Sequence, residues 1–204
     1  MKYAIIGSGE IGTALARAFA RKKIEVAIAN SRGPKTLASL TEELGPSVFP
    51  RSVQDACEAE MIFLAVPFPA HKDVAKVFKQ WNGKIVVDTT NAFHVAPEEL
   101  GDLLSSEIVS KAFAGARLVK AFNHLPAAQL GTNSSLDGQR QAVFVSSNEA
   151  DASATVAAVA TQLGFAPIEV GKLNRGGAPL HVVDGQPGGL LFQNLAKLIG
   201  EKYE

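Results

Sequence analysis

Residues 3–19 read "YAIIGSGEIGTALARAF", an apolar run that leads into a glycine-rich turn and then an amphipathic segment. The apolar run over 3–6 predicts a short buried strand. Ile11, Leu15 and Phe19 have the spacing of one helical face, which predicts a helix directly after the turn. A strand, a turn and a helix in this order are the first unit of a parallel sheet covered by helices.

Strand-like and helix-like runs alternate along the rest of the chain. Short runs rich in Ile, Val, Leu and Phe predict further strands at residues 26–29, 61–66, 85–87, 118–122, 142–147 and 166–170, with a weaker one at 48–49. Helical spacing with flanking Pro or Gly predicts helices over 34–44 and 70–81, an alanine-rich helix ending at Leu163 and a closing helix over 188–202. We therefore expect an α/β fold, a Rossmann-like, doubly wound and mainly parallel sheet with a short C-terminal βαβα extension.

The turn matches the pattern G-x-G-x-x-G, with Gly7, Gly9 and Gly12 at the fixed positions. In a strand–turn–helix unit, the first glycine permits the tight turn and the second lets a pyrophosphate approach the backbone. The third lets the helix pack closely on the sheet. The phosphates would then meet free N–H groups at the positive end of the helix dipole. This turn therefore predicts dinucleotide binding.

The second predicted strand ends without the acidic residue that holds the adenosine ribose in NAD-binding chains. Asn30, Ser31 and Arg32 follow it in "AIANSRGP", and Lys35 adds a positive charge nearby. A carboxylate would repel a 2′-phosphate, whereas a neutral amide, a hydroxyl donor and a guanidinium fork suit one. These residues favour NADP(H) over NAD as the bound nucleotide.

Composition indicates one globular domain. The chain has 204 residues and is 47% hydrophobic, so we predict a single NADP-binding domain over 1–204, with a Rossmann core (1–124) and a C-terminal extension (125–204). Twenty basic and twenty acidic residues cancel, which disfavours nucleic acid and anionic membranes as partners. Cys57 is alone, which favours a reducing, cytoplasmic setting. The most apolar segment, residues 61–70, is far shorter than the ~20 residues that span a bilayer.

The chain resembles a known family at several motifs. "IIGSGEIGTALA", "NSRGP", "LAVPF", "VVDTTNAF" and "LVKAFNHL" occur in the order seen in deazaflavin (coenzyme F420)-dependent NADP reductases. The oxidoreductase domain of six-transmembrane epithelial metalloreductases is similar as well, and "AVFVSSNEADA" extends the resemblance over nearly the whole chain. The resemblance implies a small domain that binds NADP(H), with coenzyme F420 or a flavin (FMN or FAD) lying against the nicotinamide.

The resemblance also implies which residues contact the nucleotide. In chain order, they are Gly7, Ser8, Gly9, Glu10 and Ile11 at the turn, Ser31 and Arg32 at the 2′-phosphate, Ala65, Val66 and Pro67 beneath the adenine side or the bridging ribose, and Asn91, Ala121, Phe122 and Asn123 near the nicotinamide. Gly12, Asn30 and Lys35 join this set from the pattern of the residues themselves.

Hydride transfer between two cofactors needs little acid–base chemistry from the protein, which supplies position and excludes water. The loops at the carboxyl ends of the strands bring His71, His94 and His124 toward one crevice. His124, where many relatives carry Thr, is the candidate proton carrier, although a histidine in a loop is more often a surface or structural side chain. The histidines lack metal-ligand spacing, so we predict no metal site.

Three functions fit the sequence. The first is an NADP(H)-dependent oxidoreductase that transfers hydride between NADPH and a flavin or deazaflavin-type acceptor. The second is a dehydrogenase or imine reductase with its own small carbon substrate, although such enzymes normally add an all-helical domain. The third is a non-catalytic NADPH sensor. A homodimer is expected for this class, and Leu190, Leu191 and Phe192 could cover a cofactor, form the dimer surface or close the core.

Overall fold

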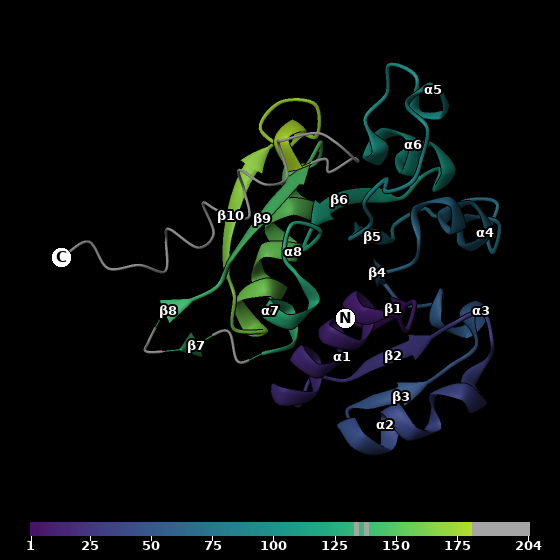
Figure 1. Cartoon of the computed structure of the whole chain (residues 1–204), viewed down its shortest axis with the longest axis vertical. Helices are drawn as coiled ribbons and strands as arrows, with labels where there is room; N and C mark the ends of the chain where they lie inside the picture. The colour runs from purple at the N-terminus through teal and green to yellow at the C-terminus, as the bar shows by residue number, and fades with distance from the viewer. Residues whose placement is uncertain (133–134, 137–138, 181–204) are drawn as a thin grey trace.

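An eight-stranded sheet forms the centre of the protein (Figure 1). The structure is a computed structural model that describes residues 1–132, 135–136 and 139–180. Across the sheet, the strands lie in the order β10 (Ala166–Gly171), β9 (Ala142–Ser147), β6 (Arg117–Ala121), β5 (Ile85–Asp88), β4 (Met61–Leu64), β1 (Tyr3–Ile6), β2 (Val26–Ala29) and β3 (Val48–Pro50). The short strands β7 (Ser135–Leu136) and β8 (Gln139–Arg140) pair separately.

Strand direction confirms the predicted Rossmann-like fold. The neighbours from β3 to β6 are all parallel, whereas β9 is antiparallel to β6 and β10 is parallel to β9. The chain order reverses at β1, which lies between β2 and β4. In an open α/β sheet, the carboxyl ends of the strands at such a reversal form the ligand-binding crevice.

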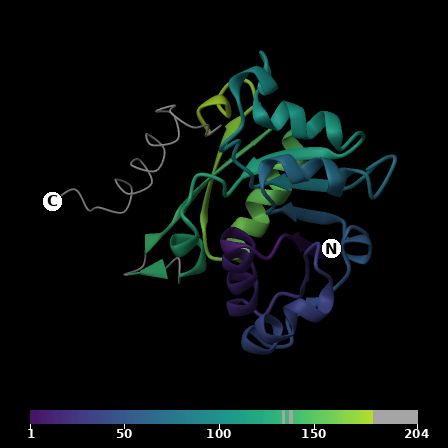
Figure 2. The same cartoon turned by 45° about the vertical axis from the view of Figure 1, so that its right-hand side comes forward.

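Helices cover both faces of the sheet, as Figure 1 and the turned view in Figure 2 show. One face carries α1 (Glu10–Arg21), α2 (Ala38–Leu44), α7 (Ala127–Gly131) and α8 (Ala150–Gln162). The other carries α3 (Val53–Ala56), α4 (His71–Ala75), α5 (Pro97–Leu100) and α6 (Ser105–Ala112). The single-turn 3-10 helices are η1 (Pro34–Leu37), η2 (Phe68–Ala70) and η3 (Ala178–Leu180).

Most strands of the sheet are buried on both faces, so their side chains alternate between two hydrophobic cores, whereas the edge strand β10 is half-exposed. Ile5, Phe63 and Val119 belong to the core beneath α1 and α8, whereas their neighbours in the strands pack beneath α4 and α6. This two-sided burial explains why the strands are continuous apolar runs and not alternating ones.

Several predicted boundaries are wrong, and each has a local cause. The helix predicted over 70–81 ends at Ala75, because the buried indole N–H of Trp81 donates to the Ala75 carbonyl at 3.0 Å and occupies the helix end. The strand predicted over 61–66 ends at Leu64, since Ala65 packs against the glycine turn.

One further predicted helix begins differently from expectation, and another falls outside the described residues. The helix predicted over 34–44 starts as the 3-10 turn η1 before α2 begins at Ala38. The closing helix predicted over 188–202, with the cluster of Leu190, Leu191 and Phe192, lies outside the described residues. The division at residue 124 and the homodimer stay predictions.

Candidate functional site

The glycine turn is held tightly between β1, β2 and β4. The Gly7 N–H donates to the Ala29 carbonyl at 2.8 Å, and its φ of +113° is one that side chains rarely allow. A Cβ at Gly7 would lie 2.0 Å from the Ala65 carbonyl oxygen, and a Cβ at Gly12 would lie 2.0 Å from the Gly7 oxygen. Both positions therefore require glycine for the fold itself.

Gly9 differs from its two neighbours in the motif. Its backbone is extended, with φ −76° and ψ −166°, and a Cβ there would meet no atom within 4 Å. The space above Gly9 is open, so glycine at this position serves something other than the packing of the chain.

The N-terminus of α1 also lacks a protein cap. Gly9 is the N-cap residue and provides no side-chain hydrogen bond to the first turn of α1, whereas the Ser52 hydroxyl accepts the Asp55 N–H at the start of α3. The free N–H groups and the helix dipole at α1 together favour an anion. A pyrophosphate fits both this uncapped helix end and the open space above Gly9.

A cleft of about 620 Å³ opens directly beside this helix end, at the carboxyl ends of β1, β2 and β4. Its lining contains the predicted residues Gly7, Ser8, Gly9, Asn30, Ser31, Arg32, Ala65, Val66 and Pro67, together with Ile6, Val53, Ala70, Asp73 and Val74. The turn and the Asn30–Arg32 segment, far apart in sequence, therefore share one cavity.

The five further lining residues were not among the predicted site residues. Ala70 and Val74 have helical spacing, which could have shown that the predicted helix presents one face to the cleft. Val53 follows Ser52, and the pattern Ser52-x-x-Asp55 could have placed a helix start there. No sequence signal indicated that α3 and α4 approach the turn from the other face of the sheet.

The charges of the cleft suit an anion near Arg32. Asn30, only 8% exposed, stands where NAD-binding chains place a carboxylate. The exposed Arg32 has no ion-pair partner among the residues that the structure describes. The acidic lining residue is Asp73, which pairs with Lys76 at 2.8 Å on exposed side chains. Hydrogen bonding with Lys76 and its charge lower the pKa of Asp73. The Asp73 carboxylate is therefore paired and solvent-exposed, whereas the Arg32 guanidinium has no carboxylate partner within the described part of the chain.

Several predicted site residues do not line this cleft; they are Glu10, Ile11, Gly12, Lys35, Asn91, Ala121, Phe122 and Asn123. Glu10 instead lines a second cleft of about 550 Å³ between α1 and α7, which shares Ser8 and Gly9 with the first. Lys35 is exposed within η1, and Gly12 packs inside the turn. The remaining residues lie at the ends of β5 and β6 or in α1.

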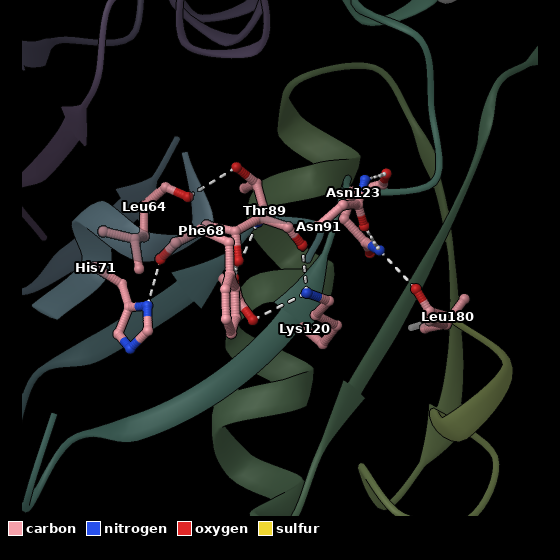
Figure 3. A network of polar contacts seen from close by, with 10 residues as sticks. Leu64, Phe68, His71, Thr89, Asn91, Lys120, Asn123 and Leu180 are labelled. Atoms are coloured by element: carbon pink, nitrogen blue, oxygen red, sulfur yellow. Dashed lines mark hydrogen bonds and ion pairs between the residues drawn. The ribbon is translucent and has the colours of Figure 1, made fainter. Parts of the chain in front are cut away.

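A buried ion pair joins the ends of β5 and β6, where Figure 3 shows Lys120. Lys120 Nζ lies 2.9 Å from Asp88 Oδ2, and both side chains are fully buried. The ammonium also donates to the Thr90 carbonyl, while Asp88 Oδ1 accepts the Thr90 N–H at 2.9 Å and the Thr90 hydroxyl at 2.7 Å. The ammonium and the carboxylate therefore have each other and Thr90 as partners, and this network holds the backbone that leads to Asn91 in place.

Two asparagines continue this network toward η3 (Figure 3). Asn91 Nδ2 donates to the Asn123 carbonyl at 2.8 Å, and Asn123 Nδ2 donates to Asn91 Oδ1 at 2.9 Å and to the Leu180 carbonyl at 2.6 Å. Phe122, between Lys120 and Asn123 in this strand end, has a φ of +64°. The structure therefore brings Asn91 and Asn123 together, as the resemblance implied, although their contact with a nucleotide stays a prediction.

Known proteins share both the cleft-forming sequence and the whole fold. The family model described as "NADP oxidoreductase coenzyme F420-dependent" matches residues 2–92, which include the turn and Arg32. The crystal structure of a hypothetical protein, SMa0349 from Sinorhizobium meliloti, is 42% identical, with 92% of each chain covered and a TM-score of 0.85. A putative F420-dependent NADP-reductase from Arthrobacter sp. FB24 is 26% identical, with 98% of this chain and 94% of that chain covered and a TM-score of 0.72. The chain belongs to the coenzyme F420-dependent NADP oxidoreductase family.

Family membership makes the chain an NADP-dependent oxidoreductase and confirms that sequence prediction. The Metalloreductase STEAP3 of Rattus norvegicus is 31% identical over 173 residues, which are 84% of this chain and 34% of that protein. This chain thus spans about a third of the length of the curated relatives it matches. Within the described ranges, every helix is too short or too polar to cross a bilayer.

The three candidate histidines, all within the described residues, do not gather in the cleft. His71 is fully buried against the Phe68 ring and donates from Nδ1 to the Phe68 carbonyl; burial lowers its pKa. His94 is exposed, with a φ of +59°. His124 is fully buried, with its ring 5.1 Å from that of Phe144, and its Nε2 accepts the Phe144 N–H at 3.4 Å.

His124 is therefore a core side chain and a poor proton carrier near neutral pH. Burial lowers its pKa to about 4, which outweighs the opposite effect of the Ala142 backbone. A charged imidazolium would also turn its Nε2 from an acceptor into a donor facing the Phe144 N–H. The structure thus removes the reason for assigning His124 a chemical role.

The buried His124 makes the fold sensitive to acid. Between its ordinary pKa of 6.5 and the folded value of about 4, the unfolded chain binds a proton that the folded chain excludes. Stability is therefore complete above pH 6.5 and falls as the pH drops through this window, by about 2–3 kcal/mol at pH 4.5. Denaturant unfolding at pH 7.5 and 4.5 should show this extra loss in the wild type relative to His124→Phe. Equal losses in both proteins would contradict the assignment.

Proposed function

We propose that this oxidoreductase binds NADP(H) in the cleft of Gly7 and Arg32 and transfers hydride between NADPH and a flavin or deazaflavin-type acceptor. One observation carries the proposal. The cleft joins a helix N-terminus without a side-chain cap to a guanidinium that has no ion-pair partner among the residues described, and the β2 end holds a neutral amide where a ribose-binding carboxylate would stand. Two separate anionic groups on one ligand match these two cationic positions.

Different lining residues would contact different parts of the nucleotide. The open backbone at Gly9 and the first turn of α1 would hold the pyrophosphate, because the first N–H groups of a helix have no partner within it and Gly9 provides no side-chain cap. Arg32 and the Ser31 hydroxyl would hold the 2′-phosphate through charge-assisted hydrogen bonds. Ala65, Val66 and Pro67, after β4, would support the bridging ribose or the adenine side.

The nicotinamide, when bound, supplies the hydride chemistry, and the chain supplies position and a dry environment. The ends of β5 and β6 hold Asn91 and Asn123 in a fixed pair, which makes them the candidates for fixing the nicotinamide end. A fixed donor and acceptor geometry lowers the barrier without a protein acid or base. This agrees with the state of His124, which follows Asn123 in the chain: burial lowers its pKa to about 4, so it is neutral near pH 7.

Arg32 gives the direct test of nucleotide choice. Arg32→Ala should weaken NADPH binding by about 1.5–3 kcal/mol, the value of hydrogen bonds to a charged group, which is about 10- to 100-fold in Kd. NADH binding should barely change, because NADH has no 2′-phosphate. Fluorescence titration of both reduced nucleotides measures this, with Lys111→Ala, an exposed cation on α6 outside the cleft, as the matched control. Equal losses for the two nucleotides after Arg32→Ala would contradict the assigned role.

The acceptor is tested by turnover. Oxidation of NADPH at 340 nm should depend on added coenzyme F420, FMN or FAD, and Arg32→Ala should raise the KM for NADPH more than it lowers kcat. Turnover with a small imine or carbonyl compound, together with no activity on any of these cofactors, would indicate that the hydride acceptor is a carbon substrate. Tight NADPH binding without turnover on any acceptor would favour the sensor.

A further inference from the structure

The Asn30 side chain, although it lines the cleft, has its hydrogen-bonding capacity used inside the protein. Its Nδ2 donates to the Ser8 hydroxyl at 2.9 Å and to the Thr36 hydroxyl at 3.1 Å. Its Oδ1 accepts the Arg32 N–H at 3.0 Å. Since both amide hydrogens and the oxygen already have partners, Asn30 is placed to join segments of the chain and not to bind a ligand.

Thr36 closes this arrangement from the other end of the loop. Its hydroxyl donates to the Gly33 carbonyl at 2.8 Å, lies 3.2 Å from Asn30 Oδ1 and accepts from Asn30 Nδ2. The Thr36 N–H also donates to the Gly33 carbonyl at 3.2 Å, and Gly33 has a φ of +89°. Thr36 thus holds both the amide that fixes the Arg32 backbone and the glycine that follows Arg32.

The same network orients Ser8. Because its Oγ accepts from Asn30 Nδ2, the hydroxyl hydrogen remains to be donated elsewhere, and no acceptor for it occurs among the residues described. Ser8 lines the cleft between Gly7 and Gly9. The Asn30 amide therefore orients the Ser8 hydroxyl on the glycine turn and, at the same time, holds the backbone N–H of Arg32.

We propose that Thr36 and Asn30 are positioning residues that set the preference for the 2′-phosphate without contacting the nucleotide. Thr36 and Asn30 fix the loop from Ser31 to Lys35, and this fixed loop presents the Arg32 guanidinium to the cleft. Ordering a loop and an arginine side chain both cost conformational entropy on binding. Because the loop backbone is already fixed, the phosphate contact must offset only the entropy lost by the Arg32 side chain. The inference rests on the proposed NADP(H) site and adds a second layer of residues to it.

A double-mutant cycle tests whether Thr36 acts through Arg32. Thr36→Val keeps the shape and removes the hydroxyl; it should weaken NADPH binding about tenfold and NADH binding by less than about twofold. In the Arg32→Ala background, Thr36→Val should have no further effect on NADPH, because the group that it positions is gone. Thr36→Ser, which restores the hydroxyl, should recover most of the affinity of the wild type for NADPH.

The outcomes separate positioning from a general structural role. Thermal unfolding of Thr36→Val should show only a small loss relative to the wild type, because Thr36 is exposed and the change leaves one Asn30 amide hydrogen without its partner. Equal losses for NADPH and NADH, an undiminished effect in the Arg32→Ala background, or no effect of Thr36→Val at all would each overturn the inference. A wild-type chain that binds neither nucleotide would instead overturn the proposed function, and the inference with it.

Discussion

Replacing Gly9 with valine is expected to abolish NADPH binding while the chain remains folded. A Cβ at this position meets no atom within 4 Å, and the extended backbone accepts any residue. The isopropyl group would instead fill the space in which the pyrophosphate approaches the N-terminus of α1. Loss of two hydrogen bonds to a charged group, at about 1.5–3 kcal/mol each, predicts a Kd raised at least about 100-fold.

Calorimetric titration with NADPH and thermal unfolding of the same samples measure both halves of this prediction. Gly12→Val is the matched control, because its Cβ would lie 2.0 Å from the Gly7 carbonyl oxygen. That variant should lose stability even without a ligand. If Gly9→Val binds NADPH as the wild type does, the turn is a structural feature and no pyrophosphate site.

Replacing Lys120 with methionine should give the largest loss of stability. Methionine fills a similar volume but leaves the fully buried Asp88 carboxylate without its ammonium partner. Removing one partner of a buried pair leaves an uncompensated charge, and we expect a loss of about 3–5 kcal/mol in the free energy of unfolding. Denaturant unfolding at pH 7.5 measures this loss.

The double variant Asp88→Asn with Lys120→Met is the control for this prediction. It removes both charges, and the amide oxygen introduced at position 88 can still accept the two hydrogen bonds that Thr90 donates to Asp88 Oδ1 in the wild type. Most of the lost stability should therefore return. Lys120→Met that unfolds with the wild-type free energy would contradict the stabilising role of the Lys120–Asp88 ion pair.

The fold was predictable because apolar periodicity and glycine placement are local signals. The runs at 3–6, 26–29 and 142–147 coincide with β1, β2 and β9, since buried parallel strands are continuous apolar segments bounded by turn residues. The end of α4 was not predictable, because a tryptophan six residues later occupies its last carbonyl. The positive φ of Phe122 was not predictable either, since no residue type in this segment signals it.

The candidate site shows the same division between local and tertiary information. The glycine turn and the Asn30–Arg32 segment could be found from residue types alone, because each type has a stated chemistry toward phosphate. The burial of Lys120 could not, since a strand-end lysine in sequence gives no sign of the carboxylate beside it. Asn30 lines the cleft, but its internal hydrogen bonds with Ser8 and Thr36 appear only in three dimensions.

The most direct measurement is the equilibrium binding of NADPH and of NADH to the wild-type chain under the same salt and pH. A guanidinium that meets the 2′-phosphate predicts tighter binding of NADPH by about 10- to 100-fold. Equal affinities, a preference for NADH or no binding of either nucleotide would contradict the account.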